Sequence, residues 1–203
     1  MKVLALDLSS KTGWALFDEG KLTERGLIQL DRPIVDYYPE YPWNYWRAAG
    51  WQAQNVNDLV KLLDPSVIVI EETNRGKNRY TQKFLEFLHC RVLEQPYVNS
   101  RKVVYISTGV WRKKLNMQLS KEDKKNNTTL AKAKRKAAEI GAKVDRTGLG
   151  IRGRIGKKHL AVRYVNTTFG LELKMKDNDI ADAICLGAAY LEGAALCDGR
   201  RDW

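Results

Sequence analysis

Four acidic residues in the sequence are candidates for a metal centre. Asp7 and Glu71 each follow a short apolar run that is typical of a buried strand. Asp179 and Asp182 are three residues apart at the start of an apolar helical pattern, so both project from one helix face. Carboxylates brought together repel one another unless cations lie between them, and Mg²⁺ is bound by a few carboxylates and phosphate oxygens. Two such ions can activate a water for phosphodiester hydrolysis.

Each of these acids also has a structural interpretation. A single Asp at a strand end is more often a turn or cap residue, and acids near a helix N-terminus are favoured by the helix dipole. Asp182 fits that interpretation poorly, because it lies beyond the first turn among small residues that we expect to be buried. Glu72 is the rival of Glu71, which we favour because it directly follows the apolar strand.

The elements that would position these acids can be predicted from patterning. Apolar runs predict strands at 3–6, 14–17, 22–30, 67–70 and 103–106, with turns at 9–13 and 18–21. Helical patterns cover 43–63, 80–93, 110–115, 159–169 and 179–196, and Thr128 or Thr129 could cap a basic helix that runs to Ile140. A β-meander followed by alternating strands and helices predicts a mixed α/β sheet covered by helices.

The positive charge is concentrated in one part of the chain. The net charge is +11, yet residues 112–163 hold 17 Lys and Arg against 4 acids, and the rest of the chain holds 18 against 20. A polyanion, and nucleic acid above all, is the expected partner. The glycine-rich loop at 145–158 lacks P-loop spacing, so we expect it to contact a phosphate backbone instead. The candidate DNA-binding residues are Arg75, Lys77, Lys113, Lys114, Arg152, Arg154, Lys157 and Lys158.

Composition sets the broad class. The 203 residues fit one domain, 1–203, with a basic insertion at about 116–156. No apolar run reaches the roughly 20 residues of a membrane span, and no signal peptide is evident, so we expect a cytoplasmic protein without a membrane partner. Three cysteines without paired spacing indicate reduced thiols. With two histidines a zinc site is improbable, and we expect an oxygen-ligated metal and no small organic cofactor.

Four segments in order resemble one protein family. LALDLSSKTGWAL, VIVIEE, ISTGVWRKKL and DNDIADAICLG are similar to the motifs of the RuvC family of Holliday-junction resolvases, in the ribonuclease H-like superfamily. The resemblance implies a mixed five-stranded sheet, an antiparallel meander followed by parallel strands, flanked by helices. It also implies a homodimer that makes paired nicks in a four-way DNA junction with Mg²⁺ or Mn²⁺, two ions per active site. Asp7, Glu71, Asp179 and Asp182 would bind the ions. Because they lie just before the helix expected from His159, we expect Lys157 or Lys158 to contact or polarise the scissile phosphate.

The sequence also departs from the family pattern. The turn after Asp7 lacks Pro-Gly, and Asn74 stands where cellular members carry an aromatic residue. Together with the insertion at 116–156, these differences suggest a bacteriophage-type member that acts in the host cytoplasm on branched DNA more broadly. The sequence leaves two other functions open: a non-catalytic branched-DNA-binding protein, and an actin- or sugar-kinase-type phosphotransferase. The second would need another glycine-rich phosphate hairpin, which the sequence does not show.

Overall fold

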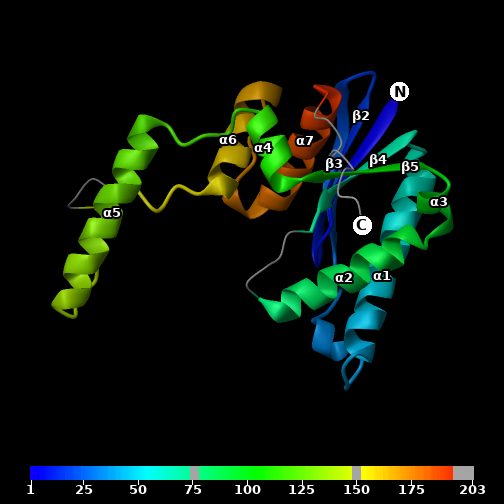
Figure 1. Ribbon diagram of the computed structural model, residues 1–203, viewed down its shortest axis with the longest axis horizontal. Coiled ribbons are helices and arrows are strands. Elements are labelled where there is room, and N and C mark those ends of the chain that lie inside the picture. The colour runs from blue at the N-terminus through cyan, green and yellow to red at the C-terminus, as the bar shows by residue number, and fades with distance from the viewer. Residues whose placement is uncertain (74–77, 148–151, 194–203) are drawn as a thin grey trace, which may run out of the picture.

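A five-stranded mixed sheet forms the centre of the molecule (Figure 1). The computed structural model describes residues 1–73, 78–147 and 152–193. The strand order is β3-β2-β1-β4-β5, where β1 is Lys2–Asp7, β2 Lys11–Asp18, β3 Lys21–Gln29, β4 Val67–Glu72 and β5 Lys102–Ser107. The first three strands are antiparallel, and β4 and β5 run parallel to β1. The predicted meander followed by parallel strands is therefore confirmed.

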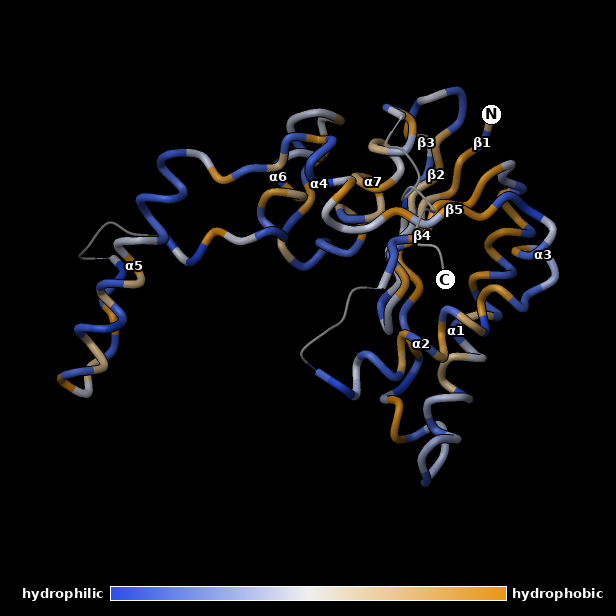
Figure 2. The backbone as a smooth tube through the Cα atoms, in the orientation of Figure 1, coloured by the Kyte–Doolittle hydropathy of each residue, from blue (hydrophilic) through white to orange (hydrophobic). Residues whose placement is uncertain are grey.

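Helices cover both faces of this sheet. The face that carries Val3, Ala5 and Val69 packs against α4 (Thr108–Lys114), α6 (Lys157–Phe169) and α7 (Asn178–Leu191). The face that carries Leu4 and Leu6 packs against α1 (Trp43–Leu63), α2 (Arg79–Leu93) and α3 (Pro96–Asn99). Strands β1 and β4 are buried on both faces, which explains why their sequences are continuous apolar runs without alternation. Figure 2 shows this distribution as orange in the sheet and in the helices beside it.

The predicted turn at residues 9–13 is wrong in its second half. Strand β2 begins at Lys11, so Thr12 and Gly13 lie in the sheet. Thr12 is fully buried, and the amide of Gln52 on α1 donates to its hydroxyl at 2.9 Å. The same amide nitrogen lies 3.0 Å from the carbonyl oxygen of Ile28. Gln52 on α1 therefore satisfies the buried polar start of strand β2. Because Gln52 is far from β2 in the sequence, local sequence patterns do not reveal this contact.

Two helix boundaries also differ from prediction. Helix α5 spans Lys121–Glu139 and is capped by Ser120, not by Thr128 or Thr129. The Ser120 hydroxyl accepts from the backbone N–H of Asp123 at 3.0 Å, and the Asp123 carboxylate accepts from that of Ser120 at 3.3 Å, which forms a capping box. Helix α7 ends at Leu191 and not at 196, with Gly193 in the left-handed region at φ 74° soon after.

The basic insertion forms an arm that stands away from the sheet. We call residues 116–156 the basic arm; it leaves the body after α4, contains α5 and returns to α6 (Figure 1). Two short 3₁₀ turns, η1 (Ile34–Asp36) and η2 (Met175–Asp177), complete the described elements. Within the described residues, no helix is both long and apolar enough to cross a membrane.

Candidate active site

The parallel strands bring two of the predicted acids side by side. In the β1–β4 ladder Leu6 pairs with Ile70, so the next residues, Asp7 and Glu71, lie next to each other at the strand ends. Side chains alternate along a strand, and the residues two and four positions before each acid face α7. Asp7 and Glu71 therefore point to the α7 side of the sheet, and Glu72 to the opposite side. This parity favours Glu71 over Glu72 as the partner of Asp7.

A glycine allows the acids of α7 to approach Asp7. Gly13 on β2 pairs with Asp7 on β1, and the first turn of α7 lies directly against it. A Cβ atom on Gly13 would be 1.9 Å from the backbone carbonyl oxygen of Asp179, a distance that real atoms do not adopt. The missing side chain thus sets the position of the α7 segment that carries Asp179 and Asp182.

Burial and mutual repulsion change the ionisation of the site. The pKa of Asp7 is raised well above its ordinary value by burial, and then by the charges of Glu71, Asp182 and Asp179. Burial raises the pKa of Asp182 to about 7, against the opposing effect of Arg112. An Arg112 Nη2 atom lies 3.8 Å from Asp182 Oδ1, and Lys158 Nζ lies 3.7 Å from Asp179 Oδ1. Two basic side chains therefore offset part of the negative charge of the four acids.

Glu71 is held by two donors from α4. The Thr108 hydroxyl donates to Oε1 of Glu71, and the indole N–H of Trp111 donates to Oε2 at 3.2 Å. Trp111 is fully buried, so it cannot move without disturbing the core. Each carboxylate oxygen retains a second lone pair. The orientation of Glu71 is therefore fixed while its oxygens can still accept another ligand.

Asp7 and Glu71 open onto a cleft of about 650 Å³. The strand ends contribute Asp7 and Glu71, α4 contributes Thr108 and Arg112, and Lys157 comes from the first turn of α6. His89 of α2 forms part of the opposite wall. The cleft thus combines carboxylates and cations, as a site for a phosphate group and a metal ion would.

The donor set fits a hard cation. Among the residues that the structure describes, no group donates a hydrogen bond to the buried Oδ1 atom of Asp182. This oxygen faces Arg112 at 3.8 Å without a hydrogen bond, and the pKa of the neighbouring Asp7 is raised by burial and then by the three other acids, so the site holds more negative charge than its basic residues offset. As they stand, no three His, Cys, Asp or Glu side chains of the described part of the chain are grouped closely enough to hold an ion. The side chains would have to close around an ion on binding.

The predicted DNA-binding residues differ in their position relative to this cleft. Lys113 and Lys114 are exposed in the last turn of α4, and Arg152 and Arg154 are exposed on the returning segment of the basic arm. Lys157 lines the cleft, and Lys158 is paired with Asp179. Arg75 and Lys77 lie outside the described residues.

Several residues of the site were not predicted. Gly13 could have been found, because a glycine within a strand often marks a close backbone approach. Arg112, Thr108 and Trp111 gave no such signal, since their roles depend on how α4 packs. The place of His89 in the cleft wall likewise depends on tertiary packing. Its Nδ1 lies 3.2 Å from the Tyr105 hydroxyl, and burial lowers the pKa of its imidazole to about 4.

The pKa of Asp182 predicts a pH-dependent stability. An ordinary Asp loses its proton near 3.8 in the unfolded chain, but the folded chain holds this proton up to about pH 7. The folded state therefore binds more protons between these values, and the stability of the metal-free protein falls as the pH rises from about 4 to 7. We expect Asp182→Asn to flatten this fall and to raise the free energy of unfolding at pH 8 by about 1–3 kcal/mol. Denaturant unfolding in EDTA measures this; a wild-type stability that rises over the same range would contradict it.

Comparison with solved structures identifies the fold. Thermus thermophilus RuvC in complex with a Holliday junction substrate superposes with a TM-score of 0.60 at 12% identity, covering 96% of this chain and 94% of that chain. A structure of Thermus thermophilus RuvC superposes with a TM-score of 0.58 at 14% identity, covering 96% of this chain and 95% of that chain. The yeast mitochondrial Holliday junction resolvase Ydc2 superposes with a TM-score of 0.51 at 12% identity, covering 95% of this chain and 78% of that chain. No family model and no curated protein match the sequence. The chain therefore has the RuvC-type, ribonuclease H-like α/β fold.

Proposed function

We propose that the protein is a divalent-metal-dependent endonuclease that resolves four-way DNA junctions and cuts other branched DNA. The observation that carries this proposal is that Asp7, Glu71, Asp179 and Asp182, from β1, β4 and α7, lie close enough to affect one another's charge, beside a cleft that Asp7 and Glu71 line. Arg112 of α4 and Lys158 of α6 pair with Asp182 and Asp179, and Lys157 of α6 lines the cleft. The structural neighbours named above support the class of substrate.

The acidic residues would bind two Mg²⁺ ions, or Mn²⁺ in their place. When bound, such ions supply an activated water and stabilise the leaving oxygen of the phosphodiester. Thr108 and Trp111 keep Glu71 oriented toward the cleft. Lys157 and Lys158 lie at the same end of α6 and contact the scissile phosphate, which Lys158 reaches by releasing Asp179. Arg112 limits the repulsion between Asp182 and an incoming phosphate.

Paired nicks require two active sites, so the protein acts as a homodimer on the junction. It needs no small organic cofactor. We assign it to a bacteriophage-type branch of the resolvases, because the basic arm and the altered turn after Asp7 depart from the compact cellular pattern.

A single gel tests the proposed function. Labelled four-way, Y-shaped, flap and linear duplex substrates are each incubated with the protein, with Mg²⁺ and with EDTA. We expect Mg²⁺-dependent nicks in the branched substrates and intact linear duplex. Binding of the junction without cleavage under any metal would indicate a non-catalytic junction-binding protein. Cleavage of linear duplex at the same rate would contradict structure selectivity.

The returning segment of the basic arm gives a second test. Arg152 and Arg154 are exposed beside the first turn of α6, where a phosphate backbone leading to the cleft would pass. We expect replacement of both by Gln to weaken junction binding and to reduce the slope of log affinity against log salt by about 2. Fluorescence anisotropy at several salt concentrations measures this. Unchanged affinity and slope would remove these residues from the interface.

A further inference from the structure

Helix α5 has two faces of very different character. It is about 28 Å long and largely hydrophilic, as Figure 2 shows by its mostly blue and white tube. At 100° per residue, six of its seven basic residues fall within about 120° of the helix circumference. We call this set the basic stripe, and all its members are exposed: Lys121, Lys124, Lys125, Lys132, Arg135 and Lys136. The seventh, Lys134, lies off the stripe.

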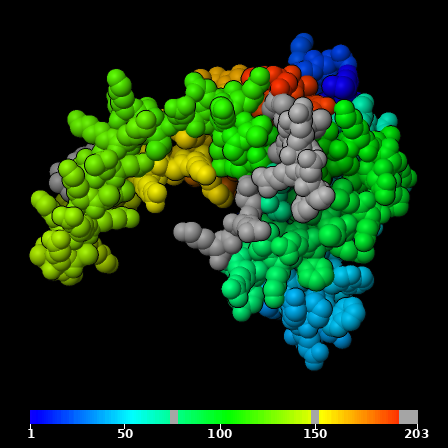
Figure 3. All heavy atoms as spheres, in the orientation of Figure 1, coloured from blue at the N-terminus to red at the C-terminus, as the bar shows by residue number. Residues whose placement is uncertain are grey.

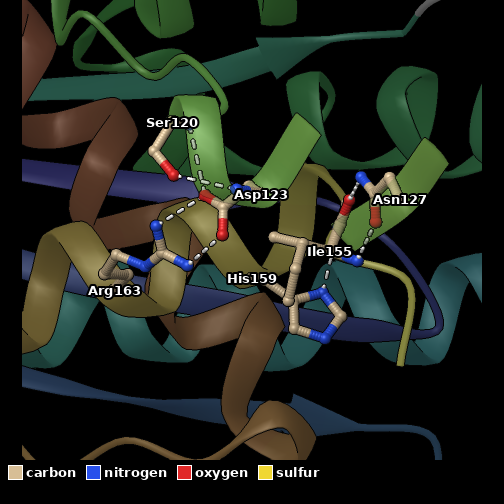
Figure 4. Close-up of polar contacts among 7 residues, drawn as sticks. Ser120, Asp123, Asn127, Ile155, His159 and Arg163 are labelled. Atoms are coloured by element: carbon tan, nitrogen blue, oxygen red, sulfur yellow. Dashed lines mark hydrogen bonds and ion pairs between the residues drawn. The ribbon is translucent and has the colours of Figure 1, made fainter. Parts of the chain in front are cut away.

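The opposite face of α5 is occupied by the returning chain. Asn127 donates to the carbonyl of Ile155 at 2.8 Å and accepts from its N–H at 2.9 Å (Figure 4). The Asn126 side chain accepts from the backbone N–H of Arg152 at 2.8 Å and donates to the carbonyl of Gly153 at 3.2 Å. Leu130 and Ile155 are both buried in the arm. These contacts fix the rotation of α5 about its own axis, so the basic stripe faces away from the returning chain.

The root of the arm is tied to α6. Arg163 of α6 contacts both carboxylate oxygens of Asp123, at 2.8 and 3.2 Å, and Ser120 caps the same turn (Figure 4). The hydrogen bonds from Arg163 lower the pKa of Asp123 to about 2, so this pair stays ionised at neutral pH. Since the first residues of α6 are Lys157 and Lys158, the direction of α5 is fixed relative to the cleft. Figure 3 shows the arm standing clear of the sheet body, with open space between them.

The chemistry of the stripe points to a phosphate backbone. Of the three acids on α5, Asp123 is bound by Arg163, Glu139 is paired with Arg135 at 3.6 Å, and Glu122 is exposed in the first turn. The basic arm contains no aromatic residue, so it has no platform on which unpaired bases could stack. A DNA duplex presents one negative charge per about 1.7 Å of its axis, or about 16 charges over the length of α5. Arg152, Arg154 and Lys157 continue the positive charge from the arm to the cleft.

We propose that the basic stripe of α5 binds the sugar-phosphate backbone of a double-stranded stem of branched DNA, beyond the base pairs at the branch point. This inference rests on the proposed function for its substrate, but concerns binding and not cleavage. The binding is independent of base sequence and depends on stem length, because only a stem long enough to reach α5 gains the added contacts.

The test compares two variants with the same loss of charge. One replaces Lys125, Lys132 and Lys136 of the stripe by Gln, and the other replaces Lys21, Lys102 and Lys134. Lys21 and Lys102 lie at the opposite end of the strands from the acids, and Lys134 lies on α5 off the stripe. Lys and Gln have similar helix propensities, so α5 is retained, which circular dichroism checks. Junctions with stems of increasing length, from about 8 to about 30 base pairs, are titrated in EDTA by fluorescence anisotropy.

We expect wild-type affinity to increase about 10-fold over this series, and the stripe variant to gain less than about 2-fold. The control variant should keep the wild-type dependence. The stripe variant should still nick the shortest junction at the wild-type rate. Equal length dependence in wild type and stripe variant would overturn the inference, and so would an equal loss in both variants. Failure of the wild type to nick any junction would instead contradict the proposed function, and the binding series would still be decisive for α5.

Discussion

Asp7→Asn abolishes nicking of a four-way junction but leaves junction binding intact. Asn keeps the size of the side chain while removing a carboxyl group that the charges of Glu71, Asp182 and Asp179 act on. We expect the cleavage rate to fall by about 10³-fold or more, because a carboxamide is a much poorer ligand for Mg²⁺. Affinity for the junction in EDTA should be unchanged, because the basic residues proposed to contact the phosphate backbone are retained. Single-turnover cleavage and gel-shift assays measure the two quantities.

Asp18→Asn is the matched control for this change. Asp18 ends β2 beside Lys2, at the opposite end of the same β1–β2 ladder, and its ion pair with the N-terminal amine is exposed. This variant should cleave at the wild-type rate. If Asp7→Asn nicked as fast as Asp18→Asn, the assignment of the acidic cleft as the active site would be wrong.

Gly13→Ala is expected to impair both stability and cleavage. The new methyl group would overlap the backbone of Asp179 and Ile180, which cannot be relieved by a change of rotamer. The first turn of α7 must then shift away from β2 and take Asp179 and Asp182 with it. Overpacking of this kind costs about 1–3 kcal/mol or more, and a displacement of about 1 Å at an active site can cost about 10²-fold in rate. Chemical denaturation and single-turnover cleavage measure these effects.

Gly50→Ala provides the contrasting substitution. Gly50 lies inside α1, and a Cβ atom there would be 3.5 Å from the nearest atom, on the flexible Arg91 side chain. Alanine should stabilise the helix by about 0.5–1 kcal/mol without affecting cleavage. A Gly13→Ala variant with wild-type stability and rate would show that the contact between β2 and α7 does not position the acids.

The sequence predicts the sheet well because its signals are local. The apolar runs before Asp7 and Glu71 reflect strands buried on both faces, and the turn at Glu19 and Gly20 uses positive φ values of 47° and 77°. Asp182 is buried, as its small neighbours in α7 predict. By contrast, the residues around Thr12 predict a turn, because the partner that satisfies the Thr12 hydroxyl in the sheet, Gln52, is 40 residues away.

The site is less predictable than the sheet, because its supporting residues act through tertiary contacts. Nothing in the sequence around Trp111 or Arg112 indicates that one donates to Glu71 and the other pairs with Asp182. The start of α5 was missed for a different reason: the capping box at Ser120 and Asp123 is a local signal, but the capping potential of the later threonines competed with it. Those threonine hydroxyls bond to carbonyls within the helix instead, at 2.8 and 3.0 Å.

Direct observation of bound metal tests the central hypothesis, that residues distant in sequence form one cation site. Crystals of Asp7→Asn and of the wild type are grown with a junction and Mn²⁺ under the same conditions, and anomalous difference maps are compared. We predict strong Mn²⁺ peaks in contact with the carboxylates of Asp7, Glu71 and Asp182 in the wild type, and their loss in the variant. A wild-type map with no peak in the cleft, or with Mn²⁺ bound only elsewhere on the protein, would contradict the hypothesis.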